Sequence, residues 1–273
     1  MAEQTGTGTD AVGVTTDDAT RIRAAVERTA AAGTLLVALD FDGTLAPFAD
    51  EPAQVGALPG SWAAVLTLDR ARDTHVVLVS GRSLGSLERV THAPSSMSLI
   101  GSHGVEWRVA GESSEALTPD ERAAVADVGA VLDEVGARHP GVVIEHKPAG
   151  HGVHTRRVSP DEARAADDDA RAAVAAVHPD VHVRAGKDIL EFSIRHVTKG
   201  DAIARLRTIL QADAVVFAGD DVTDEDGFGV LDQDDADLGV KVGPGDTAAR
   251  YRVADPAALT DVLKALARLR ATR

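Results

Sequence analysis

Residues 35–39 form a continuous apolar run, Leu-Leu-Val-Ala-Leu, that ends directly in the sequence Asp-Phe-Asp-Gly-Thr. The run has no helical spacing, and Gly33 and Gly43 bound it, which is typical of a central parallel strand covered on both faces. Ligands of open α/β sheets bind beyond the carboxyl ends of such strands. The run therefore predicts an α/β fold with a reaction centre at the tip of this strand.

Two aspartates, Asp40 and Asp42, follow the run. Alternate residues of an extended chain point to the same side, so we expect both carboxylates to project together while Phe41 turns into the core. At about 4 Å and an effective dielectric of about 20, two carboxylates repel by about 4 kcal/mol. The pair therefore requires a shared proton or a hard cation such as Mg²⁺, which leaves one carboxylate for proton transfer. The alternative is that these residues only form a polar exit into a turn.

Three polar residues at strand tips or helix starts are candidates for binding an anionic group. Thr44 offers a hydroxyl and an amide. Ser80 follows the predicted strand 75–79 and opens a predicted helix, where a phosphate can bind; the alternative is an ordinary N-cap serine. Lys199 begins the predicted helix 199–211 and brings a positive charge, and its alternative is a solvated lysine at a helix start.

A second acidic cluster, residues 219–226, follows the predicted strand 214–218. If that strand lies beside the first, Asp220 reaches the cation held by Asp40. Acidic residues at a helix start can act simply as caps, but this cluster holds more of them than a cap needs. We therefore interpret the cluster as the second part of a cation site.

The formal net charge of −15 argues against nucleic acid or an anionic membrane as a partner. The chain has no cysteine, which excludes disulfides, thiolate zinc sites and cysteine nucleophiles. We find no secretory signal and no apolar run long enough to span a membrane, and we expect a cytoplasmic location. Residues 1–16 have no periodic apolar pattern and are expected to be a disordered leader.

The periodicity changes from Glu112 onward. Two capping-box sequences, 118–121 and 159–162, predict helices over 119–138 and 160–177. The remaining predicted elements of this segment are strands over 142–147, 152–158, 181–184 and 189–194. The order α-β-β-α-β-β predicts an antiparallel sheet with both helices on one face. We therefore predict a catalytic core formed by 17–107 and 195–273, and an inserted domain formed by 108–194.

Polar side chains alternate on the strands of the predicted insert. They are Glu145 and Lys147 on one strand, His154 and Arg156 on the next, and Lys187 and Glu191 around the last hairpin. Their spacing favours a hydrogen-bonding surface for a polyhydroxylated ligand, and the alternative is the solvated face of a sheet. Outside the insert, His103 is either a ligand contact or a hydrogen-bonded histidine in a tight turn.

Four motifs of the chain resemble those of the haloacid dehalogenase superfamily of phosphohydrolases and occur in the same order. The motifs are DFDGT at 40–44, Ser80, Lys199 and GDDVTDE at 219–225. Within the superfamily, the chain is similar to the trehalose-6-phosphate phosphatase family through DFDGTLAPF at 40–48, VSGR at 79–82, GSHGVE at 101–106, VTKGDA at 197–202 and the polar residues of the insert. The resemblance covers nearly everything after residue 34. It implies a Rossmann-like parallel-sheet core with an inserted α/β cap of αββαββ, C2-type topology.

The resemblance also implies a mechanism. Asp40 would attack phosphorus and form an aspartyl-phosphate, while Asp42 would protonate the departing sugar oxygen and later accept a proton from water. The implied Mg²⁺ ligands are Asp40, the Asp42 carbonyl, Asp220 and Asp224. Thr44, Ser80 and Lys199 would bind the phosphoryl oxygens, and Asp221 would place Lys199. The implied substrate-binding residues are Arg82, His103, Glu106, Glu145, Lys147, His154, Arg156, Lys187 and Glu191.

The implied reaction is hydrolysis of trehalose 6-phosphate to trehalose and phosphate, the final step of trehalose biosynthesis. The partner is then a small-molecule sugar phosphate, and we expect a monomer with no obligate protein partner. Two alternatives remain: a related phosphatase for sucrose 6-phosphate or mannosyl-3-phosphoglycerate, and a non-catalytic sugar-phosphate sensor on the same scaffold.

Overall fold

The computed structural model describes residues 16–48, 55–186 and 188–273. Residues 1–15 of the predicted leader and Lys187, a predicted substrate-binding residue, lie outside the described residues. The chain divides into two compact units. The first unit comprises Met1–Val77, Ile203–Asp220 and Gly227–Arg273, and the second unit comprises Leu78–Ala202 and Asp221–Asp226. The domain boundaries predicted from the sequence stay a prediction.

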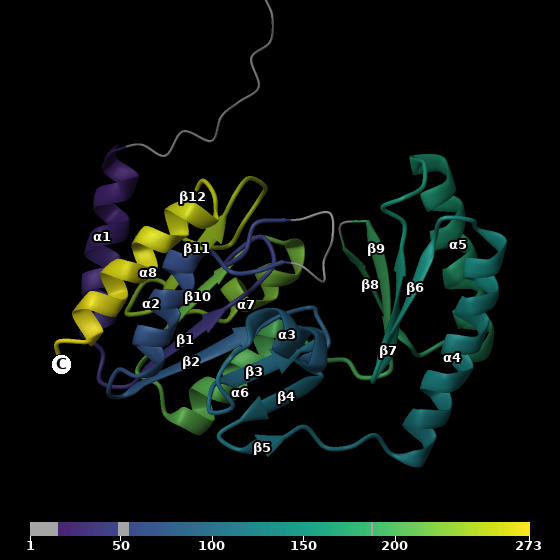
Figure 1. Ribbon diagram of the computed structural model, residues 1–273, viewed down its shortest axis with the longest axis horizontal. Helices are drawn as coiled ribbons and strands as arrows, with labels where there is room; N and C mark the ends of the chain where they lie inside the picture. The colour runs from purple at the N-terminus through teal and green to yellow at the C-terminus, as the bar shows by residue number, and fades with distance from the viewer. Residues whose placement is uncertain (1–15, 49–54, 187) are drawn as a thin grey trace, which may run out of the picture. The chain divides into compact units, whose positions relative to one another are not determined.

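Helices and strands alternate along most of the described chain (Figure 1). The helices are α1 (Thr16–Ala30), α2 (Pro59–Asp69), α3 (Leu84–Thr91), α4 (Pro119–Arg138), α5 (Pro160–Val177), α6 (Lys199–Leu210), α7 (Glu225–Gly229) and α8 (Pro256–Arg270), with the 3-10 helices η2 (Ser102–Gly104) and η3 (Val222–Asp224). The strands are β1 (Leu35–Leu39), β2 (Thr74–Val79), β3 (Ser98–Gly101), β4 (Glu106–Val109), β5 (Glu112–Ser113), β6 (Val143–Lys147), β7 (Gly150–His154), β8 (His182–Gly186), β9 (Ile189–Ser193), β10 (Ala214–Gly219), β11 (Leu238–Val242) and β12 (Tyr251–Val253).

The larger sheet has the strand order β12-β11-β10-β1-β2-β3-β4-β5. β1 pairs in parallel with β10, so that Leu39 lies opposite Ala218, and β10 pairs in parallel with β11. Every residue of β1 and β10 is buried, as a strand covered on both faces requires. The predictions of a central parallel strand at 35–39 and of a strand at 214–218 are confirmed. The two strands lie side by side, which is the condition under which Asp220 was expected to reach the cation.

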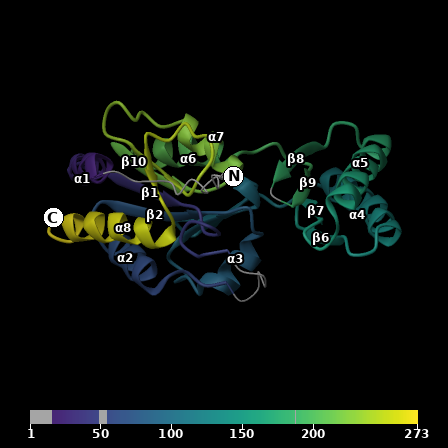
Figure 2. The same cartoon turned by 90° about the horizontal axis from the view of Figure 1, so that it is seen from above.

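Helix α8 packs against α1 and α2 within the first unit, and the three helices lie side by side in both ribbon views (Figures 1 and 2). Arg270 on α8 is 1% exposed. Its guanidinium donates to the Thr74 hydroxyl at 2.9 Å and to five backbone carbonyls, those of Ala30, Ala32, Gly33, Arg72 and Asp73. Because a guanidinium presents five N–H donors in a fixed plane, this one side chain satisfies carbonyls from two separate chain segments.

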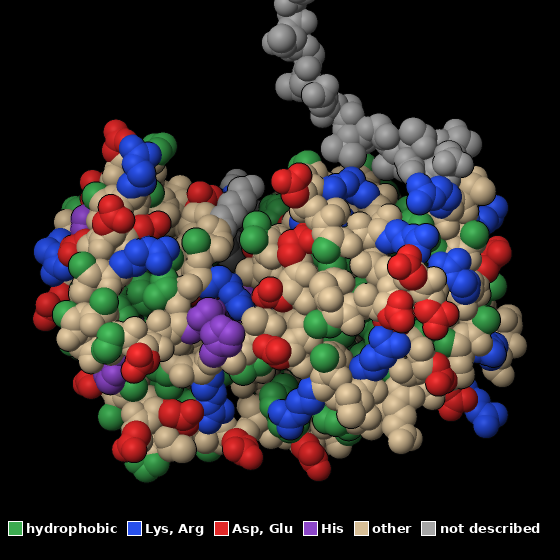
Figure 3. Space-filling view, turned by 180° about the vertical axis from the view of Figure 1, so that it is seen from behind, with side chains coloured by type: hydrophobic (Ala, Val, Ile, Leu, Met, Phe, Trp, Pro, Cys, Tyr) green, Lys and Arg blue, Asp and Glu red, His purple; other side chains and the backbone are tan. Residues whose placement is uncertain are grey.

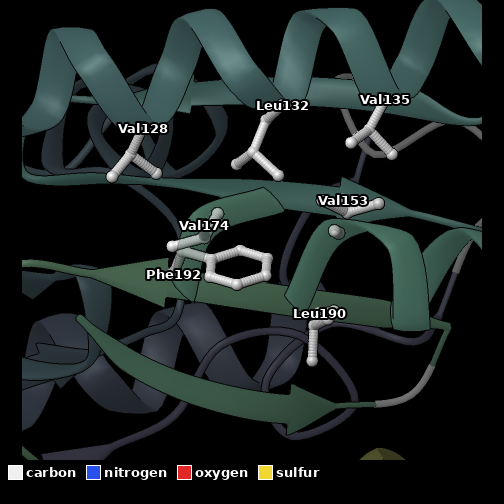
Figure 4. Close-up of a cluster of buried hydrophobic side chains, with 8 residues drawn as sticks. Val128, Leu132, Val135, Val153, Val174, Leu190 and Phe192 are labelled. Atoms are coloured by element: carbon white, nitrogen blue, oxygen red, sulfur yellow. The ribbon is translucent and has the colours of Figure 1, made fainter. Parts of the chain in front are cut away.

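The second unit contains an antiparallel sheet with the order β6-β7-β9-β8. Helices α4 and α5 both lie on one face of this sheet (Figure 2). Figure 4 shows the core between them, in which Leu132 and Val135 of α4 and Val174 of α5 pack with Val153 and Phe192 of the sheet. The predicted α-β-β-α-β-β arrangement with both helices on one face is confirmed.

The helix starts of this unit follow their predicted capping sequences. The Thr118 hydroxyl accepts from the Glu121 amide, and the Glu121 carboxylate accepts from the Thr118 amide. The Ser159 hydroxyl accepts from the Glu162 amide at 3.3 Å. These bonds satisfy N–H groups that have no partner within the helix.

A strand is present where 152–158 was predicted, but the predicted limits are wrong, because β7 spans Gly150–His154. Lys147 pairs with Gly150, so the turn contains only Pro148 and Ala149, and β7 ends at His154. Arg156 lies beyond the strand and is exposed. The sequence pattern had suggested that Arg156 and His154 share a strand face, and the structure shows that they do not.

No helix among the described residues is long and apolar enough to cross a membrane. The predicted cytoplasmic location stays a prediction.

Candidate active site

Asp40 follows β1 directly and is almost fully buried. Its amide donates to the carbonyl of Ala218 at 3.0 Å, which continues the pairing of β1 with β10 by one residue. Phe41 is fully buried, as the alternation of an extended chain predicted. Asp42 is partly exposed and forms a β-bridge with Ala46. The turn at residues 43–45 therefore follows Asp42 directly, and Asp42 stays accessible.

Asp220 follows β10 in the same unit, at the tip of the strand next to β1. The buried Thr44 hydroxyl donates to the Asp220 carboxylate at 3.2 Å. Gly43 has φ +78°, and a Cβ at this position would overlap the Asp220 carboxylate. Glycine is thus required here both for the backbone angle and for the close approach of Asp220.

Among the described residues, Asp40, Asp220 and Asp224 each offer a carboxylate oxygen, and these oxygens lie within 4.8 Å of one another. Three carboxylates this close repel unless a proton or a cation lies among them. Carboxylate oxygens are hard donors that suit Mg²⁺, Ca²⁺ or Mn²⁺. The residues present therefore fit a divalent metal ion.

Lys199 pairs with Asp224. Its Nζ lies 2.7 Å from Asp224 Oδ1, and both side chains are buried. The other carboxylate oxygen of Asp224 accepts from the amide of Asp221 at 2.9 Å. The family resemblance implies that Asp221 helps to place Lys199, and that role of Asp221 stays a prediction.

Ser80 lies at the end of β2 and is buried. Its hydroxyl accepts from the Arg82 amide at 3.2 Å. Helix α3 begins only at Leu84, and Ser83 is its N-cap, because the Ser83 hydroxyl accepts from the Ser86 amide. The prediction that Ser80 opens a helix is wrong, and so is the alternative that it is an N-cap.

The predicted substrate residues His103, Lys147 and Glu191 form one hydrogen-bonded network in the second unit. His103 Nε2 lies 2.7 Å from Glu191 Oε2. Lys147 Nζ contacts the other oxygen of Glu191 and donates to the carbonyl of Gly81 at 3.0 Å. A Cβ on Gly81 would lie 2.6 Å from Cε1 of His103, so the histidine ring requires glycine at this position.

The protonation states in this network follow from its surroundings. Burial lowers the pKa of His103, even though Glu191 favours the imidazolium. Burial opposes ionisation of Glu191, but His103 and Lys147 more than compensate, so the pKa of Glu191 lies well below its usual range. At neutral pH, a neutral His103 therefore donates from Nε2 to an ionised Glu191.

His103 lies in a strained turn. Ser102 and His103 have φ values of 47° and 58°, which are uncommon for residues other than glycine. Glu106 supports this turn, because its carboxylate accepts from the Ser102 hydroxyl at 2.5 Å and from the Leu84 amide at 3.4 Å. Glu106 was predicted to bind substrate, and within this unit it bonds the turn that carries His103.

The polar face of the smaller sheet aligns further predicted residues. Glu145 lies opposite Gly152, and Gly152 lies opposite Glu191, so the two carboxylates face each other across a strand that has no side chain between them. His154 Nε2 lies 2.9 Å from the Glu145 carboxylate. Burial raises the pKa of Glu145, but the His154 hydrogen bond and the Lys147 charge outweigh it and lower the pKa.

A cavity adjoins this face, and several basic and polar side chains are among the residues that line it. They include His103, Lys147, His182, Arg184, Glu191 and Ser193. Figure 3 shows histidine side chains grouped beside Lys and Arg side chains on one surface of the molecule. The rings of His182 and His196 lie 4.1 Å apart, edge to face. The polar face thus carries cationic groups although the protein as a whole is strongly acidic.

Lys241 on β11 was not predicted from the sequence. It is 3% exposed, and its Nζ donates to the backbone carbonyl of Asp220 at 2.6 Å. The available signal was a lysine in an otherwise apolar strand, Leu-Gly-Val-Lys-Val. A charged residue inside such a run is a candidate for a specific buried contact.

The sequence matches the trehalose-phosphatase family model over residues 38–257. It is 33% identical over 224 residues to trehalose-6-phosphate phosphatase of Escherichia coli K12, a match that covers 79% of this chain and 80% of that protein. It is 32% identical over 204 residues to trehalose-phosphate phosphatase of Mycobacterium avium, covering 70% of this chain and 50% of that protein.

Solved structures agree on the fold. The C-terminal domain of trehalose-6-phosphate phosphatase from C. albicans superposes with a TM-score of 0.78 at 22% identity, covering 90% of this chain and 96% of that chain. A trehalose-6-phosphate phosphatase related protein superposes with a TM-score of 0.71 at 26% identity, and the match covers 86% of this chain and 97% of that chain. The predicted haloacid dehalogenase fold is therefore confirmed, and the extent of the family match shows that the chain belongs to the trehalose-phosphatase family.

Proposed function

We propose that this chain hydrolyses trehalose 6-phosphate to trehalose and inorganic phosphate, the final step of trehalose biosynthesis. The observation that carries this proposal is the buried Asp40 at the tip of β1, next to the strand that ends in Asp220, in a chain 33% identical to an enzyme named for this substrate. A small-molecule phosphate ester is the substrate class that fits the family.

Asp40 is the proposed nucleophile. Its carboxylate attacks phosphorus, the bond from phosphorus to the sugar oxygen breaks, and Asp42 donates a proton to that oxygen. Water then attacks the phosphorus of the aspartyl-phosphate and gives a proton to Asp42. The bond from phosphorus to the Asp40 oxygen breaks, inorganic phosphate leaves, and the Asp40 carboxylate and the protonated Asp42 are restored. The partial exposure of Asp42 supports its role in exchanging protons with water.

Mg²⁺ is the proposed metal, held by Asp40, the Asp42 carbonyl, Asp220 and Asp224. When bound, it offsets negative charge on the phosphoryl group. Thr44, Ser80 and Lys199 are assigned to the phosphoryl oxygens, where hydroxyl and ammonium donors stabilise the charge that the reaction develops. Asp221 is assigned to the placement of Lys199, together with the observed Asp224 contact.

The sugar is assigned to the polar face of the smaller sheet. Glu145 and Glu191 accept hydrogen bonds from sugar hydroxyls, and Lys147 donates to them. Gly152, which lies between the two carboxylates, places no side chain of its own on this face. Arg82, His103, Glu106, His154, Arg156 and Lys187 are the remaining proposed substrate residues.

The test is phosphate release from trehalose 6-phosphate, sucrose 6-phosphate, mannosyl-3-phosphoglycerate and glucose 6-phosphate, each with and without Mg²⁺, with Asp40→Asn as the blank. We expect Mg²⁺-dependent release from the trehalose ester alone. Release chiefly from another ester would overturn the substrate, and release from none would favour a sugar-phosphate sensor.

A second arm isolates sugar recognition. Glu191→Ala should lower kcat/KM for trehalose 6-phosphate by about 10–100-fold, the equivalent of one hydrogen bond to a charged group. The same variant should leave hydrolysis of p-nitrophenyl phosphate largely unchanged, since that ester has no sugar. Equal losses on both esters would remove Glu191 from substrate recognition.

A further inference from the structure

Lys241 carries a buried positive charge at a strand tip. It lies opposite Gly219 in the parallel pair of β10 and β11, one residue before Asp220. Taking an ammonium group out of water costs several kcal/mol unless its contacts are well formed. Its observed acceptor is the backbone carbonyl of Asp220, at 2.6 Å. A lysine at this position therefore acts on the backbone that follows β10.

The peptide group between Asp220 and Asp221 is bound on both sides. Its carbonyl oxygen accepts from Lys241, and its N–H, which belongs to Asp221, donates to Asp224 Oδ2 at 2.9 Å. Asp224 Oδ1 accepts in turn from Lys199. Hydrogen bonds connected in this way polarise and strengthen one another. The orientation of one peptide plane thus fixes the Asp224 carboxylate.

The same peptide plane fixes Asp220. The Asp220 side chain branches from the Cα that precedes the bound carbonyl, and Thr44 holds its carboxylate from the other side at 3.2 Å. Rotation of the peptide plane would therefore displace Asp220 and Asp224 together. Both belong to the acidic group that fits a divalent cation.

We propose that Lys241 is a positioning residue of the metal site: by holding the peptide between Asp220 and Asp221, it orients the carboxylates of Asp220 and Asp224 toward the cation. This inference rests on the proposed metal binding but not on the proposed substrate. Loss of a group that orients a metal ligand commonly weakens metal affinity by about 10–100-fold.

Two effects of removing Lys241 have opposite signs. Loss of the hydrogen bond loosens the two ligands and weakens cation binding. Loss of the positive charge reduces repulsion of the cation and strengthens binding. The direction of the change therefore separates positioning from simple electrostatic repulsion.

The experiment is a calorimetric titration of the metal-free protein with Mg²⁺, and with Mn²⁺ as a second probe. The variants are Lys241→Met, which removes both donor and charge, and Lys241→Arg, which keeps both. Lys264→Met on α8 is the matched control, because its side chain is 51% exposed. We expect a dissociation constant about 10–100-fold higher for Lys241→Met, substantial recovery for Lys241→Arg, and the wild-type value for Lys264→Met.

Equal or tighter binding by Lys241→Met would overturn the inference, as would an absence of Mg²⁺ and Mn²⁺ binding by the wild-type protein. Circular dichroism establishes that each variant is folded, and Lys241→Leu, which also removes both donor and charge, replaces Lys241→Met if the latter is not. The titration contains no substrate, so failure to hydrolyse trehalose 6-phosphate would overturn the proposed function without changing this result.

Discussion

Lys199 Nζ lies 2.7 Å from Asp224 Oδ1, and the two side chains are 2% and 0% exposed. A buried ion pair of this kind adds little stability compared with apolar residues of similar volume, but removing one partner leaves a buried charge uncompensated. The contact links the predicted phosphate-binding lysine to the predicted metal site through a single carboxylate. Lys199 therefore contributes to stability as well as to the proposed chemistry.

Replacing this lysine should destabilise the metal-free protein. Lys199→Met removes the ammonium group that pairs with the buried Asp224 carboxylate, and we expect the free energy of unfolding to fall by about 3–5 kcal/mol. Urea denaturation of the metal-free protein measures the change. Lys264→Met, an exposed lysine on α8, should change it by less than about 0.5 kcal/mol. Equal stability of the two variants would contradict the importance of the buried pair.

A methyl group at position 81 should disturb the His103 network. In Gly81→Ala the new Cβ would lie 2.6 Å from His103 Cε1, so the ring or the turn must move. We expect a loss of about 1–3 kcal/mol in the free energy of unfolding. The loss should be smaller when the same change is made in a His103→Ala background, because the ring is then absent. If the losses of Gly81→Ala and His103→Ala simply add in the double variant, the new methyl group does not act through the His103 ring.

The stability of the second unit should depend on pH through His139. The hydrogen bond to Glu162, together with that to Asp169, raises the pKa of His139 above 6.5. A raised pKa gives stabilisation that is fully present below pH 6.5 and is lost as the pH rises through the folded value. Thermal unfolding of wild type and His139→Gln from pH 5.5 to 9 tests this. We expect their difference to shrink with rising pH, and a constant difference would refute the linkage.

Arg270 should be required for the stability of the first unit. Arg270→Met removes donors from the Thr74 hydroxyl and from carbonyls at the start of β1 and β2, and unsatisfied buried groups cost about 1–3 kcal/mol each. We expect the free energy of unfolding to fall by at least about 3 kcal/mol. Arg268→Met, two residues away and exposed, is the control. A similar small effect of both changes would show that water replaces the guanidinium.

The sequence predicted elements best where hydrophobic periodicity and end signals agree. The strand 35–39 is bounded by glycines, and the helix 119–138 begins with a full capping box, and both appear at their predicted positions. The hairpin of β4 and β5 was missed, because its turn uses Ala110 and Gly111 at positive φ rather than a common turn pair. β12 was missed because three residues show no usable alternation.

The candidate site was predicted to the extent that its residues stand at strand tips. The sequence placed Asp40 and Asp220 at strand tips but left open whether the two strands are neighbours, and β1 and β10 do pair. Contacts that depend on side-chain reach were not predictable. Lys199 and Asp224 are 25 positions apart, and Lys241 contacts a backbone carbonyl, which carries no sequence signal of its own. The limits of β7 were predicted wrongly, because they depend on its pairing with β6, and the alternation of side chains along one strand does not determine that pairing.

The Arg270 contacts also bear on how the first unit folds. The bond from Arg270 to Ala30 joins residues 240 positions apart, and the whole second unit lies between them in the sequence. Closing a flexible loop of that length costs on the order of 5 kcal/mol in chain entropy. If the second unit folds first, its compact form shortens the effective loop and reduces this cost. The first unit is therefore expected to fold more slowly when the intervening segment is unfolded, because its non-local contacts then form against the full entropy of the loop.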